Sequence, residues 1–202
     1  MLVIGLTGSI GMGKSTVAKR FRENGIAVFD ADAAVHKLYE GEAVHLVEEA
    51  FPGTTENGKV DRTKLAAVLA GDKPAIKRLE AIVHPLVRDA RELFLEEQEI
   101  FGANLAVLEI PLLFETDSQG DVDVTLVVSA PAEIQRERVL ARPGMTEERF
   151  ATILNNQMPD AQKRKLADYV VDTGREIAET HAEIDKFIEM ITRQQETLAP
   201  DA

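Results

Sequence analysis

The segment Gly8-Ser9-Ile10-Gly11-Met12-Gly13-Lys14-Ser15 fits the pattern G-x-x-x-x-G-K-[ST]. It follows a short apolar run, Leu2 to Leu6, and opens a predicted helix over Lys14 to Asn24, which Gly25 ends. The motif requires this strand–loop–helix context, because glycines let successive backbone N–H groups converge on phosphate oxygens at a helix N-terminus. The segment therefore predicts a nucleoside triphosphate site. The alternative is a glycine turn with a solvated lysine.

Short apolar runs recur along the chain and predict buried parallel strands. After the first run, the candidates are Ile26 to Phe29, Leu105 to Ile110, Val124 to Val128 and Tyr169 to Val171. Continuous apolar runs that alternate with helices are typical of sheets buried on both faces. We therefore predict an α/β fold, a three-layer sandwich around a five-stranded parallel sheet.

The spacing of these runs predicts one domain, residues 1–202, with two excursions from its core. The core comprises about 1–32, 103–141 and 166–202, a helical insertion covers about 33–102, and a small lid covers about 142–165. About 75 residues separate the second and third runs, which is too long for one crossover helix. The predicted helices of the insertion are Ala33 to Phe51, Arg62 to Ala70, Pro74 to Val83 and Pro85 to Phe101; the lid holds one near Glu147 to Asn156.

Composition limits the classes of partner. The 202 residues include 35 Asp and Glu against 23 Lys and Arg, a formal charge of −12. This balance disfavours nonspecific nucleic-acid binding and docking on an anionic membrane surface. The chain has no Cys, which excludes disulfides and thiol catalysis. No apolar run approaches about 20 residues, and the N-terminus lacks a signal-peptide pattern, so we expect a cytoplasmic protein. We also expect no obligatory protein partner.

Two aspartates follow the second predicted strand, at the sheet edge where open α/β sheets bind ligands. A carboxylate there can accept the proton of an incoming hydroxyl, and this role is open for Asp32. Asp32 could equally cap the next helix. Asp30 could hold a water on Mg²⁺. Glu109, late in the third run, is either a structural residue or a carboxylate near the metal, and the pattern does not decide between them.

The segment from Pro131 to Lys165 is locally basic, with seven Lys and Arg against five Asp and Glu, a balance of 7 − 5 = +2. Arg138 and Arg142 are four residues apart, which predicts that they share a helix face. An arginine that closes over a triphosphate stabilises the charge on the transferred group, and Arg142, beside Pro143, is the candidate. For Arg136, Arg149 and the cluster around Lys163 a solvated helix face is the plausible alternative. His36, His45 and His181 suggest only structural or solvated roles.

Beyond the phosphate loop, a series of later motifs resembles the dephospho-CoA kinase family. The segments that carry the resemblance are Ile4 to Thr16, Asp30-Ala31-Asp32, Gly58 to Arg62, Leu79-Glu80, His84-Pro85, Pro111 to Glu115, Gln135 with Arg138 and Arg142, Gln157, and Ala167-Asp168. They cover nearly the whole chain. One departure is Asp172-Thr173-Gly174, where many members have Asp-Asn, in a loop that the family places beside the adenine.

The resemblance implies a P-loop kinase fold and the transfer of the γ-phosphoryl group of ATP to the 3′-hydroxyl of dephospho-CoA. It implies Asp32, Lys14 and Arg142 as catalytic residues, with Ser15 as the Mg²⁺ ligand. The residues implied for ATP binding are Gly8, Gly11, Met12, Gly13, Lys14, Ser15 and Thr16, and those implied for the acceptor are Thr7, Asp32, Arg62, His84, Pro85 and Leu112.

Two other functions fit part of this pattern. A different small-molecule or nucleoside monophosphate kinase would share the loop, the aspartate and the lid, but not the Gly58 to Arg62 and His84-Pro85 motifs. A nucleotide-dependent switch would share the loop alone and would leave the aspartate pair and the large insertion unexplained.

Overall fold

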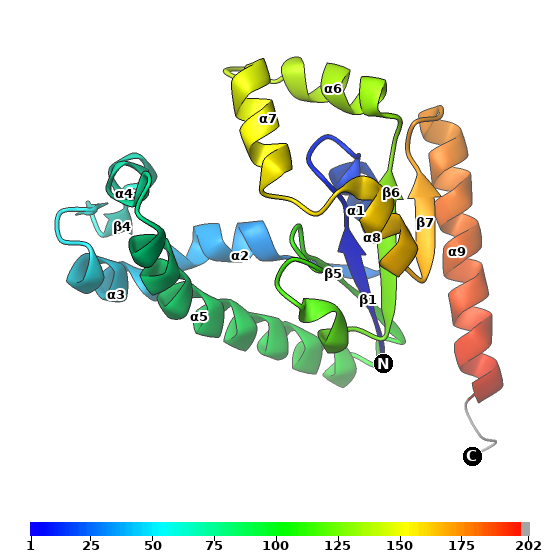
Figure 1. The fold of residues 1–202 in the computed structure, drawn as a ribbon. Coiled ribbons are helices and arrows are strands. Elements are labelled where there is room, and N and C mark those ends of the chain that lie inside the picture. The colour runs from blue at the N-terminus through cyan, green and yellow to red at the C-terminus, as the bar shows by residue number, and fades with distance from the viewer. Residues whose placement is uncertain (199–202) are drawn as a thin grey trace. The chain divides into compact units, whose positions relative to one another are not determined.

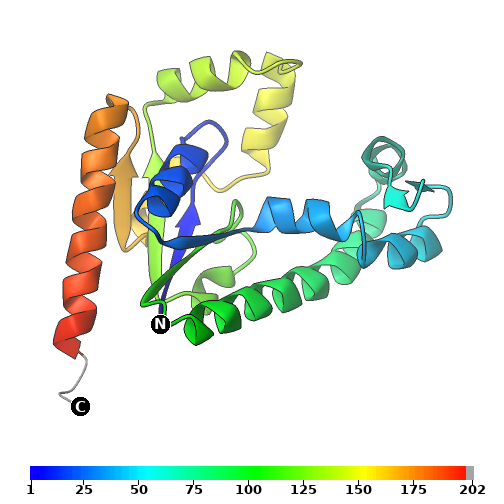
Figure 2. The same ribbon diagram turned by 180° about the vertical axis from the view of Figure 1, so that it is seen from behind.

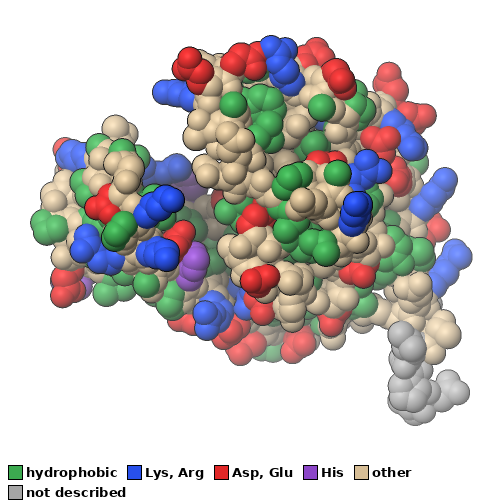
Figure 3. Space-filling view, in the orientation of Figure 1, with side chains coloured by type: hydrophobic (Ala, Val, Ile, Leu, Met, Phe, Trp, Pro, Cys, Tyr) green, Lys and Arg blue, Asp and Glu red, His purple; other side chains and the backbone are tan. Residues whose placement is uncertain are grey.

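The computed structural model describes residues 1–198 and divides into two compact units. The first unit comprises residues 1–29 together with the chain from Gln98 onward, and the second comprises residues 30–97. Acidic and basic side chains are interspersed over the face drawn in Figure 3.

The first unit is built on a five-stranded sheet in the order β2-β5-β1-β6-β7 (Figure 1). Its strands are β1 (Leu2–Thr7), β2 (Ala27–Asp30), β5 (Leu105–Glu109), β6 (Val124–Ser129) and β7 (Tyr169–Asp172). The central strand β1 pairs in parallel with β5 on one side and with β6 on the other, and β6 pairs in parallel with β7. The predicted α/β fold with a five-stranded parallel sheet is confirmed.

Helices cover both faces of this sheet. On one face, seen from behind in Figure 2, α1 (Lys14–Glu23) and α9 (Ile177–Leu198) pack against each other and against the strands. In this layer the rings of Phe21 and Phe187 pack edge to face, with their centroids 6.3 Å apart. On the other face, Val127 packs with Leu113 and Phe114. The side chains of β6 alternate between the two layers, because successive residues of a strand point to opposite faces.

Three further helices and a 3₁₀ turn complete the first unit. They are α6 (Ala132–Leu140), α7 (Glu147–Asn155), α8 (Asp160–Leu166) and η1 (Ser118–Asp121). Because α6 ends at Leu140, Arg138 and Arg142 do not share a helix face, and that prediction is wrong. A proline disfavours the helical conformation of the residue before it, so Pro143 prevents Arg142 from continuing the helix.

The second unit is mainly helical and has its own core. It contains α2 (Ala31–Leu38), α3 (Ala43–Ala50), α4 (Arg62–Leu69), most of α5 (Lys73–Ile100) and a hairpin of β3 (Thr55–Glu56) and β4 (Lys59–Val60). Its buried core residues are Leu38, Ala43, Val47, Phe51, Val60, Leu65 and Ala75.

Three of the helices predicted for the insertion differ from those observed. The helix predicted over Ala33 to Phe51 is interrupted between Leu38 and Ala43, where Gly41 lies, because glycine favours a break in a helix. Conversely, α5 runs unbroken through Pro85, where two helices were expected. The helix accommodates Pro85 at the cost of the one hydrogen bond that a proline cannot donate. Within residues 1–198, none of the helices combines the length and the apolarity needed to cross a membrane.

Candidate active site

The loop between β1 and α1 presents a set of unsatisfied backbone donors. The N–H groups of Met12 and Thr16 bond to Ser9 and Gly13 within the loop. In the part of the chain that the structure describes, the amides without an acceptor include those of Gly11, Gly13, Lys14 and Ser15 at the start of α1. The N-terminus of α1 also has no side-chain cap and no acidic residue in its first turn. A helix end with free donors and no carboxylate is a site for an anion such as a phosphate.

The loop glycines are required by both conformation and packing. Gly11 and Gly13 have φ values of 77° and 82°, which side chains disfavour. A Cβ at Gly8 would lie 2.4 Å from Val128, and one at Gly11 would lie 2.5 Å from Val139. Met12 is 2% exposed, so its side chain packs in the core and only its backbone faces the loop.

Lys14 is held by a carboxylate beneath the loop. Its Nζ lies 2.9 Å from Oε1 of Glu109, and the Glu109 residue is 6% exposed. Glu109 ends β5, which is the neighbour of β1 in the sheet. A buried charge is stable where it is paired, so this ion pair accounts for Glu109 as a partner of the loop lysine. The sequence left Glu109 open between a structural residue and a carboxylate near the metal, and did not predict its pairing with Lys14.

Two glutamines from separate helical segments hold the peptide of Ile10. Gln157 follows α7 and accepts the Ile10 N–H through its Oε1 at 3.1 Å. Gln135 in α6 is buried, and its Nε2 donates to the Ile10 carbonyl at 2.8 Å. These two residues bracket the segment that includes Arg142 and α7. The loop is therefore bonded to α6, which precedes the expected lid, and to one residue within that lid.

The loop after β7 supports the phosphate loop from the other side. Thr173 is 4% exposed, and its hydroxyl lies 2.7 Å from the Met12 carbonyl. A Cβ at Gly13 would lie 3.0 Å from this hydroxyl. Arg138 donates to the Thr173 carbonyl at 2.7 Å. Thr173 thus packs against the loop and links it to α6. In the sequence, the one signal that pointed to Thr173 was its departure from the pattern of the family.

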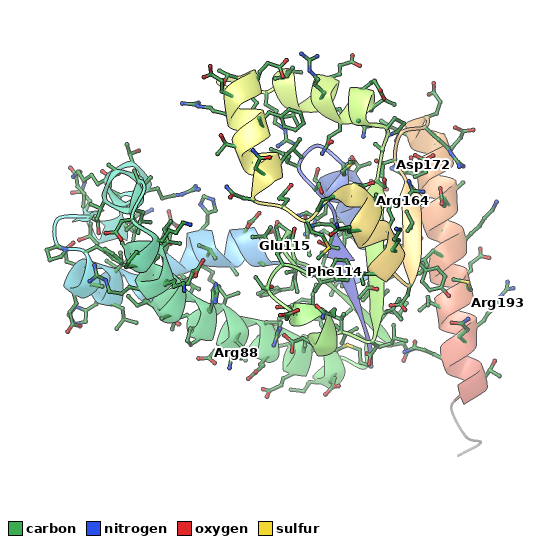
Figure 4. The ribbon with its side chains drawn as sticks, in the orientation of Figure 1. Arg88, Phe114, Glu115, Arg164, Asp172 and Arg193 are labelled. Atoms are coloured by element: carbon green, nitrogen blue, oxygen red, sulfur yellow. The ribbon has the colours of Figure 1, made fainter. Side chains whose placement is uncertain are left out.

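A buried ion pair anchors the segment that follows β5. Lys163 in α8 is fully buried, and its Nζ lies 2.9 Å from Oε1 of Glu115. Figure 4 labels Glu115 and its neighbour Phe114. The Met158 N–H donates to the same Glu115 oxygen at 2.7 Å, and Lys163 also donates to the Pro111 carbonyl. A solvated helix face is therefore wrong for Lys163. The error arises because local pattern does not show that α8 packs on β6.

The two aspartates after β2 have different surroundings. Asp30 is the N-cap of α2, and its Oδ1 accepts the Ala33 N–H at 2.9 Å. Asp32 lies in the first turn of α2 and is exposed. The capping role that the sequence left open for Asp32 thus belongs to Asp30. The Asp32 carboxylate is left available to a ligand.

Asp32 opens into a cavity of about 460 Å³ within the second unit. Arg62, the first residue of α4, lines the same cavity, and its Nη1 lies 2.8 Å from Nε2 of His36. His36, for which the sequence suggested only a structural or solvated role, is therefore part of this pocket. The other lining residues are Val35, Tyr39, Leu65, Ala66, Leu69 and Leu79.

Comparisons with known proteins identify the family. A family model described as dephospho-CoA kinase matches residues 2–179. The chain belongs to the dephospho-CoA kinase family. A dephospho-CoA kinase of Mesorhizobium japonicum is 57% identical over 195 residues, which cover 96% of this chain and 99% of that protein.

Solved structures agree with the family assignment. A crystal structure of TT1252 from Thermus thermophilus has a TM-score of 0.80 at 37% identity and covers 96% of this chain and 97% of its own. A dephospho-CoA kinase from Campylobacter jejuni has a TM-score of 0.67 at 25% identity, and the match covers 94% of this chain and 96% of that one.

The remaining residues that the dephospho-CoA kinase resemblance implies lie in varied surroundings. Arg142 is exposed, and its guanidinium has no partner among the described residues. Thr7 is fully buried and donates to the Pro111 carbonyl at 3.1 Å. Leu112 is 39% exposed in the turn after β5. His84 and Pro85 are exposed on α5 and are absent from the lining of the pocket. The roles that the resemblance implies for all of these residues stay predictions.

The Ile10 contacts make a prediction that distinguishes the two glutamines. In Gln157→Glu the carboxylate still accepts the Ile10 N–H, so we expect the Tm of the nucleotide-free protein to change little. In Gln135→Glu the buried group can no longer donate and faces a carbonyl oxygen. We expect the free energy of unfolding of Gln135→Glu to fall by about 1–3 kcal/mol, which lowers its Tm by about 3–10 °C. Equal effects in a thermal melt would contradict this asymmetry.

Proposed function

We propose that this chain transfers the γ-phosphoryl group of ATP to the ribose 3′-hydroxyl of dephospho-CoA, which forms coenzyme A and completes its biosynthesis. Family membership supports this reaction. The observation that carries it in the structure is the uncapped N-terminus of α1 with its four free amides, because it suits a polyphosphate. A cytoplasmic location and action without a protein partner belong to the same proposal.

Lys14 and the free amides of the loop would hold the β- and γ-phosphates of ATP. Lys14 would exchange its contact with Glu109 for phosphate oxygens of greater negative charge. Arg142, with no partner among the described residues, would then close over the transferred group as part of a lid spanning about residues 142–165.

The residues present fit Mg²⁺ as a metal carried with the nucleotide. In the described part of the chain, no three His, Asp or Glu side chains gather as a metal site. Magnesium is commonly bound through one or two protein ligands and the substrate phosphates, and the exposed Ser15 hydroxyl at the start of α1 can supply one. When bound, the ion would neutralise charge on the phosphates.

Asp32 would orient the acceptor hydroxyl and receive its proton. The bond from the ribose 3′-oxygen to the γ-phosphorus forms while the bond from that phosphorus to the β,γ-bridging oxygen breaks, and ADP leaves. The exposed position of Asp32 and the capping of α2 by Asp30 support this role.

A panel of acceptors tests the function. Purified protein with Mg²⁺ and ATP is offered dephospho-CoA, AMP, CMP or shikimate, and the phosphorylated product is identified by mass spectrometry. We expect turnover with dephospho-CoA at a kcat/KM at least 100-fold above that of the other acceptors. Turnover with another acceptor, and none with dephospho-CoA, would refute the proposal.

A further inference from the structure

The peptide bond between Met12 and Gly13 is held on its carbonyl side by a residue from outside the phosphate loop. The buried Thr173 hydroxyl donates to the Met12 carbonyl at 2.7 Å; the Ser129 carbonyl is farther away, at 3.2 Å. In a trans peptide the carbonyl and the N–H of the next residue point in opposite directions. The Gly13 N–H is therefore directed away from Thr173, and it has no acceptor within residues 1–198.

The peptide bond between Ile10 and Gly11 is held in the same way. Gln135 is buried, and its Nε2 donates to the Ile10 carbonyl at 2.8 Å. The Gly11 N–H is therefore directed away from Gln135, and among the described residues it also has no acceptor. The N–H of Met12, which lies between the two glycines, bonds to the Ser9 carbonyl. Each glycine amide that is available to a ligand thus follows a carbonyl that an outside side chain holds.

The two glycines explain why these carbonyls need to be held. Gly11 and Gly13 have positive φ, but a glycine adopts negative φ about as readily. The peptide bond before a glycine can therefore turn over, because the turn changes only the preceding ψ and the φ of the glycine. Such a turn would direct the Met12 carbonyl oxygen toward a bound anion and the Gly13 N–H away from it. A loop that binds phosphate through these amides needs both carbonyls fixed on the opposite side.

The two side chains that hold the carbonyls also pack against the glycines. A Cβ at Gly13 would lie 3.0 Å from the Thr173 hydroxyl and 3.3 Å from its methyl group. A Cβ at Gly11 would lie 3.3 Å from Cγ of Gln135. Thr173 is itself fixed to the sheet, because its N–H donates to the Ser129 carbonyl at the end of β6 at 2.8 Å. Both side chains are therefore placed to restrict the loop as well as to bond to it.

We propose that Thr173 and Gln135 are positioning residues that keep the N–H groups of Gly13 and Gly11 directed at the phosphates of the nucleotide. This inference rests on the proposed function in one respect, that the loop binds a polyphosphate. Neither side chain has to touch the nucleotide, because each acts through the carbonyl that it holds. The loop is thereby ordered for phosphate before the nucleotide arrives, and binding does not have to supply the free energy of ordering it.

Binding of inorganic tripolyphosphate tests the role of Thr173, because this probe offers phosphates without a nucleoside. Thr173→Val keeps the branched shape beside Gly13 but replaces the hydroxyl by a methyl group, which cannot hold the Met12 carbonyl. In calorimetric titrations with Mg²⁺ present, the Kd for tripolyphosphate should rise about 10- to 100-fold, because a hydrogen bond to a charged group is lost. Thr173→Ser keeps the hydroxyl, and its Kd should stay within about threefold of the wild type.

Two further measurements separate positioning from general stability. Gln135→Met has a side chain of similar length but no donor, and it should raise the Kd for tripolyphosphate in the same sense as Thr173→Val. In steady-state kinetics Thr173→Val should raise the KM for ATP, while the KM for dephospho-CoA stays within about twofold. Partial unfolding would instead reduce the active fraction, which lowers the apparent kcat and leaves both KM values unchanged.

Thr54 in the second unit provides a matched control. It is 1% exposed, and its hydroxyl donates to the Phe51 carbonyl, also at 2.7 Å. Thr54→Val therefore removes a buried hydrogen bond of the same kind and length. We expect it to lower the Tm about as much as Thr173→Val does, and to leave the Kd for tripolyphosphate unchanged.

Four results would overturn the proposal. They are a wild type that does not bind tripolyphosphate, an unchanged Kd in Thr173→Val or Gln135→Met, an equal rise of the Kd in Thr54→Val, and a Thr173→Ser variant that binds as weakly as Thr173→Val. Failure of the proposed function is a separate outcome, because tripolyphosphate binding needs no acceptor. A wild type that bound tripolyphosphate but did not phosphorylate dephospho-CoA would refute the proposed function and leave the positioning roles standing.

Discussion

Asp32→Asn should lower kcat by about 10²- to 10⁴-fold while the Kd for ATP stays within twofold. General base catalysis typically contributes this range, and an amide cannot take the hydroxyl proton. Asn has nearly the size of Asp, and the Asp32 side chain is exposed and does not cap α2, so folding should not be impaired. Single-turnover kinetics with labelled ATP, together with calorimetric titration of the nucleotide, measure the two quantities separately.

Two neighbouring substitutions sharpen this test. Asn is as good an N-cap as Asp, so Asp30→Asn keeps the cap of α2 and separates the cap from the carboxylate. Asp89→Asn, on an exposed face of α5, controls for loss of one negative charge from the second unit. If the kcat of Asp32→Asn were near normal, or if Asp89→Asn lowered kcat by as large a factor, Asp32 would not be the base.

Lys163→Met should destabilise the protein by about 3–5 kcal/mol, because it leaves the Glu115 carboxylate partly buried without its counter-charge. One Glu115 oxygen is already buried without a hydrogen-bond partner, so the site has little capacity to compensate. For a chain of this length the expected fall in Tm is about 10 °C or more. Urea unfolding of the wild type and the variant gives the free energy.

A double-mutant cycle separates the ion pair from the packing of the lysine. In Lys163→Met/Glu115→Gln the neutral amide oxygen still accepts the Met158 N–H, and no unpaired charge remains. We expect this variant to regain most of the lost stability. The exposed pair of Lys59 and Glu40, at 2.7 Å, is the matched control, and Lys59→Met should cost less than about 1 kcal/mol. Additive single effects in the buried pair would contradict the ion-pair argument.

Local sequence signals predicted the first unit better than the second. The five strands were predicted to within about a residue, because each is a short apolar run bounded by glycine or polar residues. In the second unit, no strand was predicted, yet Asn57 and Gly58 both have positive φ and turn the β3–β4 hairpin. Asn-Gly is a strong hairpin signal, so this element was within reach of the sequence. The uninterrupted helix through Pro85 was not, since a proline normally ends a helix.

The candidate site likewise has one part that local sequence predicted and another that it did not. The phosphate loop needs eight consecutive residues with defined φ angles and free amides, so it is written locally and was predicted from Gly8 to Ser15. The partners of the loop come from distant segments: Glu109 for Lys14, Gln135 and Gln157 for Ile10, and Thr173 for Met12. No spacing rule connects residues that lie about 100 positions or more apart in the sequence.

The amino-acid sequence by itself determined the α/β fold, the nucleotide loop and the family, because local backbone geometry and hydrophobic periodicity are encoded in contiguous residues. Tertiary structure alone decided which charges are paired and which are available. It paired Lys163 with Glu115, gave the capping role to Asp30 and left Asp32 exposed, and set His36 against Arg62 in one pocket. Whether a charge is buried, paired or exposed depends on its neighbours in space, and packing brings those neighbours together from different parts of the chain.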